Sequence, residues 1–223
     1  MAEKGVVIEF DFAVLNGAEL LFDTAKKFLK ELDDIKLDTA LEARYLTGNG
    51  YQDGLARLFA FVKTKKTAQK AARDLPEVFR AAVTAAVPSV FGASFKNFVK
   101  ALTEKGVGVV FATRANVEKV KPRFEAAFGP EVILYQETSD CYGAARWDAW
   151  RRARFEAGIR HVSAVAIAGS GVSVKSALLA GMRSLAVVND HVAYQDFGGA
   201  NALLPELSGK TARKVLEALH VEV

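Results

Sequence analysis

Cysteine is nearly absent from the sequence, and this limits the sites that the chain can build. Cys141 is the only cysteine, so an intrachain disulfide and a zinc cluster of several thiolates are both excluded. Long apolar runs are missing as well, because none approaches the ~18 residues that a transmembrane helix needs. The opening residues, Met1-Ala2-Glu3-Lys4, lead directly into a strand-like run and do not resemble a secretion signal. From these features we predict a cytoplasmic protein that does not associate with membranes.

A large excess of charge of one sign is missing too. The formal net charge is +4, which is too small to indicate binding to nucleic acid. Hydrophobic residues make up 51% of the chain and charged residues 25%, a balance that excludes a disordered or fibrous protein. The length of 223 residues predicts one large domain, or one domain that carries a smaller insert.

Short apolar runs alternate with helical periodicity along most of the chain. We expect strands at residues 6–8, 107–113, 132–135, 162–168 and 184–188, separated by helices. This alternation predicts an α/β fold, with a parallel sheet that is covered by helices on both faces. Residues 16–86 differ, because they show helical periodicity only. We therefore expect an α/β core of residues 1–15 and 87–223 and an all-α cap of residues 16–86, inserted after the first strand.

Four segments follow one another in an order that is typical of one superfamily. They are Val6–Leu15, which contains two carboxylates, the strand that ends at Thr113, the segment Val165–Met182, and the stretch Gly199–Leu207. Together they resemble the motifs of the haloacid dehalogenase-like (HAD) hydrolases, and the insert lies where the helical-cap subgroup of phosphoglucomutases and phosphatases carries its cap. The resemblance implies a HAD-like Rossmannoid fold and a phosphatase-type scaffold.

The first motif departs from the pattern that the resemblance implies. In the family, a first Asp attacks phosphorus and a second Asp, two residues later, protonates the leaving group. Here these positions hold Glu9 and Asp11, and the following glycine is replaced by Phe12. We expect Glu9 and Asp11 to lie on the same side of one strand, as a nucleophile and an acid/base acting on one phosphoryl group would. A solvated pair of carboxylates at a strand end is the alternative.

The later motifs depart further. The family's metal-binding Asp positions fall on Gly169 and Ser173, and its lysine would lie near Ala144, with Arg146 as the nearest cation. Mg²⁺ prefers carboxylate oxygens, so the sequence predicts no tightly bound cofactor and at most weak binding of Mg²⁺. Phosphoryl transfer depends on positioning and charge neutralisation, so we expect impaired aspartyl-phosphate chemistry.

Several residues remain as candidates for binding an anion. A hydroxyl at a strand end and the backbone N–H after it can hold an oxyanion, and a guanidinium can bind phosphate or carboxylate at two points. These candidates are Thr113, Arg114, Gly169, Ser170 and, as a replacement for the missing lysine, Arg146. Structural alternatives are a hydroxyl that bonds the loop for Thr113 and a surface arginine for Arg114 and Arg146.

Three functions remain open at this point. The first is a phosphatase-like protein with little or no phosphatase activity that binds a small anionic molecule. The second is an active hydrolase of small molecules that uses Glu9 and Asp11. The third is a non-catalytic regulatory or protein-binding module, whose protein partner the sequence does not identify.

Overall fold

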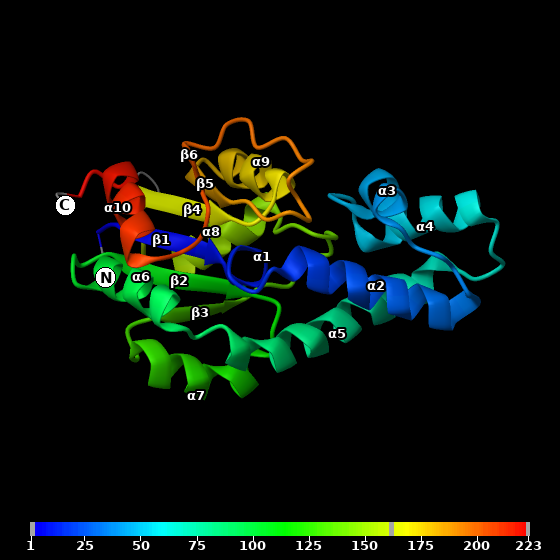
Figure 1. Cartoon of the computed structure of the whole chain (residues 1–223), viewed down its shortest axis with the longest axis horizontal. Coiled ribbons are helices and arrows are strands. Elements are labelled where there is room, and N and C mark those ends of the chain that lie inside the picture. The colour runs from blue at the N-terminus through cyan, green and yellow to red at the C-terminus, as the bar shows by residue number, and fades with distance from the viewer. Residues whose placement is uncertain (1–2, 161–162, 222–223) are drawn as a thin grey trace.

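A computed structural model describes residues 3–160 and 163–221 of the chain. Its centre is a six-stranded parallel sheet with the strand order β3-β2-β1-β4-β5-β6 (Figure 1). The strands are β1 (Gly5–Glu9), β2 (Gly108–Thr113), β3 (Ile133–Gln136), β4 (Ala164–Ala168), β5 (Arg183–Val187) and β6 (Ala202–Leu204). The predicted α/β fold with a parallel sheet is confirmed. One expected strand residue, Val162, lies outside the described residues.

The first strand occupies the middle of the sheet. β1 pairs with β2, where Gly5 is opposite Gly108, and with β4, where Gly5 is opposite Ala164. The carboxyl ends of parallel strands meet at one edge of a sheet, and ligands of open α/β sheets bind at that edge. The ends of β1, β2 and β4 therefore bring the three predicted motifs together, although the first motif lies more than 100 residues before the other two in the sequence.

The two faces of the sheet are packed differently. One face carries bulky side chains such as Ile8 and Phe111, which pack in one core cluster with Phe98 and Phe124. The other face is rich in alanine, and its strands pack in a second cluster with Trp150. The core helices are α6 (Ala93–Thr103), α7 (Val117–Phe128), α8 (Trp147–Glu156), α9 (Gly171–Leu179) and α10 (Gly209–Ala218). Small strand residues let α8 and α9 lie close to the sheet.

Helices alone connect β1 to α6, apart from a single isolated bridge at Gly50. A one-turn helix, α1 (Phe10–Ala13), follows β1 directly. The helical block of residues 17–86 then consists of α2 (Gly17–Asp33), α3 (Thr39–Leu41), the π-helical turn η1 (Glu42–Leu46), α4 (Tyr51–Val62) and α5 (Ala68–Ala86), and the short turn η2 (Val87–Ser89) leads into α6. The block lies beyond the carboxyl ends of the strands (Figure 1), over the predicted site.

Apolar side chains anchor the helical block to the core. Leu75, Phe79 and Val83 repeat every four residues along α5 and are fully buried, which is the pattern of a helix with one apolar face. The Phe79 ring lies 6.1 Å from the ring of Phe12 in α1. The block therefore packs directly on the turn that follows β1.

Among the described residues, no single helix has the length and hydropathy to cross a membrane. One bent pair passes the same test by length and composition, Ala68–Ser89 with Ala93–Thr103, but the two helices meet at 89°.

Candidate functional site

The two predicted carboxylates do not lie on one strand. β1 ends at Glu9, and the chain then turns into α1, where the Val14 N–H donates to the carbonyl oxygen of Phe10. The expectation that Asp11 continues the strand is therefore wrong. The cause is packing, because Phe10 must reach an aromatic cluster, with its ring centroid 4.9 Å from that of Phe124. The expectation of a solvated pair also fails, since Glu9 is 3% and Asp11 2% exposed.

Glu9 is held by three donors of the protein itself. Its Oε1 accepts from the backbone N–H of Ala145 at 2.9 Å and from the Ser173 hydroxyl at 2.7 Å, and its Oε2 accepts from the backbone N–H of Gly169 at 2.9 Å. These donors come from the loop before α8, from the end of β4 and from the first turn of α9. Glu9 thus links four segments, and the carboxylate lies where a helix N-terminus favours negative charge.

Burial sets the protonation of Glu9. Removal from water disfavours the charged form and raises its pKa to about 7, although the Gly169 N–H, the Ser173 hydroxyl and the Arg114 guanidinium act in the opposite direction. Glu9 therefore changes charge near neutral pH.

Asp11 is held in the same way by the end of β2. The Thr113 hydroxyl donates to its Oδ1 at 2.5 Å, and the Arg114 N–H donates to its Oδ2 at 2.7 Å. Burial raises the pKa of Asp11 to about 6. The hydroxyl and the N–H that were expected to hold an anion are bonded in this structure to the side chain of Asp11.

Arg114 is the buried cation of this site, with 7% of its surface exposed. Its Nε donates to Glu137 at 2.7 Å, and its Nη2 donates to the carbonyl oxygens of Cys141 and Ala144 at 3.1 and 2.6 Å. The Ala144 contact places the guanidinium next to the position where the resemblance implies a lysine. The charge of Arg114 lowers the pKa of both Glu9 and Asp11, against the larger effect of burial.

Gly169 is in close contact with α1. A Cβ atom at this position would lie 2.2 Å from the carbonyl carbon of Phe12, so no residue with a side chain fits without movement of the backbone. Next to it, the Ser170 hydroxyl accepts from the Ser173 N–H at 3.1 Å, which caps α9, and donates to the carbonyl oxygen of Gly143 at 3.2 Å. Both residues shape the turn that holds Glu9.

Arg146 does not reach the carboxylate pair. Its side chain is half exposed and pairs with Asp140 at 3.1 Å and with Asp148 at 3.6 Å. Its interpretation as a replacement for the lysine is therefore wrong, because the backbone at 146 begins α8 and directs the side chain to the surface. Arg114 supplies the buried charge instead.

Sequence reasoning missed a second group of buried polar residues. Glu42 accepts from the Tyr142 hydroxyl at 2.8 Å, and its other oxygen lies 3.1 Å from Nε2 of His191. Glu42 belongs to η1 and its two partners belong to the core, so the cluster joins the helical block to the sheet. Burial raises the pKa of Glu42. The three residues lie up to 149 positions apart, so no local pattern indicates the cluster.

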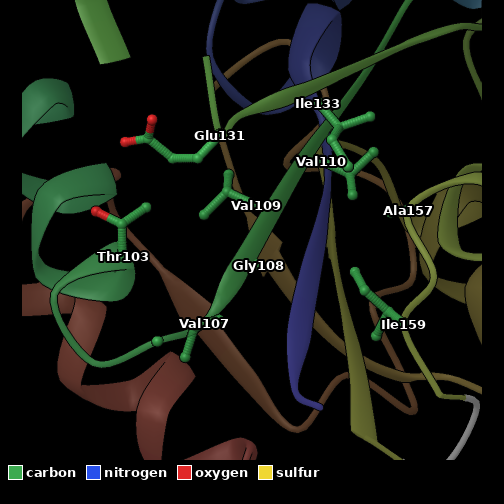
Figure 2. A pocket seen from close by; sticks show the side chains of 10 residues that line it. Thr103, Val107, Gly108, Val109, Val110, Glu131, Ile133, Ala157 and Ile159 are labelled. Carbon is green, nitrogen blue, oxygen red and sulfur yellow. The ribbon is translucent and has the colours of Figure 1, made fainter. Parts of the chain in front are cut away.

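A pocket of about 370 Å³ lies at the opposite end of β2, near its first residues. Figure 2 shows Val107, Val109, Val110, Ile133 and Ile159 around it. β3 begins opposite Val110, so the pocket occupies the space beside the first residues of β2. None of the predicted site residues lines it.

The arrangement of this sheet and its helical block is shared with solved structures of known proteins. CbbY from Rhodobacter sphaeroides, solved in complex with phosphate, aligns with a TM-score of 0.65 at 20% identity over 95% of this chain and 96% of that one. A phosphonoacetaldehyde hydrolase-like protein from Oleispira antarctica aligns with a TM-score of 0.68 at 13% identity, over 99% and 94%. A HAD family hydrolase from Deinococcus radiodurans R1, with bound phosphate and sodium, aligns with a TM-score of 0.59 at 18% identity over 99% of both chains.

The chain has the HAD-like hydrolase fold. No protein-family model matches the sequence, and no curated protein matches it. The likeness therefore lies in the architecture, and it confirms the HAD-like fold that the order of the motifs predicts.

The residues of this HAD-like fold do not fit the divalent cation that the resemblance implies. Mg²⁺ is usually held by one or two carboxylates in near-octahedral geometry, whereas Glu9 is the one carboxylate left at the implied positions and it already accepts three hydrogen bonds from the protein. A carboxylate at Gly169 would collide with Phe12, and the other position holds the hydroxyl of Ser173. Among the described residues, no three His, Cys, Asp or Glu side chains form a group suited to a metal ion.

Proposed function

We propose that this protein is a HAD-like hydrolase scaffold that performs little or no phosphoester hydrolysis and instead binds a small anionic molecule. The hydrogen bonding of Glu9 carries this proposal. A nucleophilic carboxylate must present an oxygen to phosphorus, whereas Glu9 is held by three protein donors and is buried away from solvent.

The surroundings of Asp11 support the same proposal. A general acid must reach the leaving-group oxygen at hydrogen-bond distance, yet both oxygens of Asp11 are bonded to Thr113 and Arg114. The donors that would hold a phosphate are thus occupied by the protein's own carboxylates. Glu9 and Asp11 take the place of a bound anion.

The alternative is an active hydrolase that uses the same pair, and one observation favours it. With pKa values of about 7 and about 6, Glu9 and Asp11 exchange protons in the range where general acids and bases operate. In that case the closed site must open before each turnover.

An activity assay separates the two functions. The parent protein, Glu9→Ala and Asp11→Ala are incubated with a panel of phosphomonoesters and Mg²⁺, and the release of phosphate is measured. We expect no release above the buffer rate for any of the three. Turnover that is present in the parent and lost in both variants would establish the active hydrolase.

The proposal includes the cellular location of the protein and the class of its ligand. The single cysteine and the small net charge support a cytoplasmic location and a small-molecule ligand in place of nucleic acid or a membrane. A regulatory or protein-binding role is compatible with a scaffold that does not hydrolyse its ligand.

A further inference from the structure

A second pocket, of about 230 Å³, lies where the helical block meets the core. Its rim is formed by α5 and by the loop that follows β3, with Glu77 and Asp140 largely exposed. Arg114 and Tyr51 also line it, and both are more than nine-tenths buried, so they form its floor. Glu9 and Asp11 do not line this pocket.

Three residues that line this pocket each carry a buried hydrogen-bond donor for which the described part of the chain supplies no acceptor. These donors are Nη1 of Arg114, the hydroxyl of Tyr51 and Nε of Arg80. All other guanidinium nitrogens of Arg114 have partners at 2.6–3.4 Å. A buried donor without an acceptor costs roughly 1–3 kcal/mol, and native proteins rarely leave one unpaired. Three in one pocket indicate that an acceptor from outside the chain belongs there.

The charges around the pocket restrict what that acceptor can be. Arg114 is paired with Glu137, and Arg80 is paired with Glu77 at 3.1 Å. Since each cation already has an anion, a group with two negative charges would be repelled by the acidic side chains of the lining. A single carboxylate adds one charge and two acceptor oxygens, which suits the free donors.

Tyr51 is suited to donate a hydrogen bond. Burial raises the pKa of its hydroxyl to about 12, although the nearby charge of Arg114 lowers it. The hydroxyl therefore keeps its proton at neutral pH. Its ring packs against that of Tyr142, with 5.7 Å between the centroids, so the ring position does not depend on the hydroxyl.

We propose that this pocket binds a small carboxylate whose oxygens accept hydrogen bonds from Arg114 Nη1 and the Tyr51 hydroxyl, with Arg80 Nε as a third donor. The proposal deepens the small-anion part of the proposed function, on which it rests, and is independent of the loss of hydrolysis. The volume corresponds to about eight water molecules, enough for a carboxylate with a few carbon atoms. The three donor atoms are covered, so the ligand reaches them only after side chains of the pocket move.

Binding of simple carboxylates tests the proposal. Acetate, propionate, butyrate and, for comparison, inorganic phosphate are titrated into the protein by calorimetry, and thermal unfolding is followed in parallel. We expect a carboxylate to bind and to raise the melting temperature with concentration. Tyr51→Phe removes the hydroxyl and keeps the ring, so binding should weaken about tenfold or more. Tyr45→Phe, which changes a tyrosine outside the pocket, should leave binding unchanged.

Three results would overturn the proposal. They are the absence of binding by all three carboxylates, binding of phosphate in preference to them, and carboxylate binding that neither Tyr51→Phe nor Arg80→Gln weakens. The variants remain interpretable because the circular dichroism of each is compared with that of the parent. Phosphatase turnover together with carboxylate binding would contradict the proposed loss of hydrolysis and support this site. No turnover and no carboxylate binding would support the loss of hydrolysis and contradict this site.

Discussion

Arg114 belongs to both the carboxylate centre and the pocket at the helical block. The two regions differ in whether their polar atoms have hydrogen-bond partners. In the centre, each oxygen of Glu9 and Asp11 accepts at least one hydrogen bond. In the pocket, Arg114, Tyr51 and Arg80 each keep a donor without a partner. A region whose hydrogen bonds are complete stabilises the fold, and a region that lacks acceptors is prepared for a ligand. Loss of a side chain should therefore harm the two regions very differently.

Replacement of Glu9 should have the largest effect. Glu9→Ala leaves the buried N–H groups of Ala145 and Gly169 and the Ser173 hydroxyl without their acceptor, so we expect the free energy of unfolding to fall by roughly 3–5 kcal/mol. Urea denaturation measures this change. Glu118→Ala, on the exposed side of α7, is the control and should change stability by less than about 0.5 kcal/mol. Equal losses in the two variants would show that Glu9 does not link these segments.

The contact of Gly169 with Phe12 should give the next largest effect. In Gly169→Ala the new methyl group meets the carbonyl carbon of Phe12 at 2.2 Å, so we expect a loss of about 1–3 kcal/mol or more from overpacking. Gly92→Ala is the matched control, since a Cβ there meets nothing within 4 Å. The same contact means that Glu9→Asp, Gly169→Asp and Ser173→Asp together should not restore a Mg²⁺ site, because the nearest atom belongs to the backbone of Phe12. Thermal unfolding of the two alanine variants measures the loss of stability. Equal melting temperatures for Gly169→Ala and Gly92→Ala would contradict the predicted overpacking.

The pH dependence of stability should reveal the buried carboxyl groups. The folded pKa values of about 7 for Glu9 and about 6 for Asp11 lie above the ordinary values of 4.5 and 3.8. The folded state then holds more protons than the unfolded state between about pH 4 and pH 7, so the free energy of unfolding should fall as the pH rises through this range. Glu9→Gln, although less stable overall, should show a flatter profile. A parent protein that gains stability over this range would mean that the hydrogen bonds outweigh burial.

The smallest effect should come from the pocket. Tyr51→Phe removes a hydroxyl that has no partner, so without ligand we expect the free energy of unfolding to stay within about 0.5 kcal/mol of the parent or to rise. Denaturation of the ligand-free variant measures this. A clear loss of stability would show that the hydroxyl already has a partner, such as an ordered water, and would remove the contrast with Glu9.

The sequence predicts the scaffold of the site well, because that scaffold follows from local patterns. Alternating apolar runs and helical periodicity indicate the parallel sheet, and the carboxylates follow its first strand. The turn at Asp11 was missed, since a short apolar run does not distinguish strand from helix. The depth of Arg114 was missed as well, because its partner Glu137 lies 23 residues away and no periodicity relates the two. The identity of the bound anion, the protein's own carboxylates, depends on distances that only the folded chain sets.

The only thiol of the chain can be used to measure local opening where the helical block contacts the core. Cys141 is 8% exposed and forms an isolated backbone bridge with Gly50 of the helical block, and burial raises its pKa to about 11. Since a thiolate must be accessible to react, a disulfide reagent will modify Cys141 only as fast as the structure around the thiol opens. The modification rate thus reports how often Cys141 becomes accessible, without any label or engineered residue.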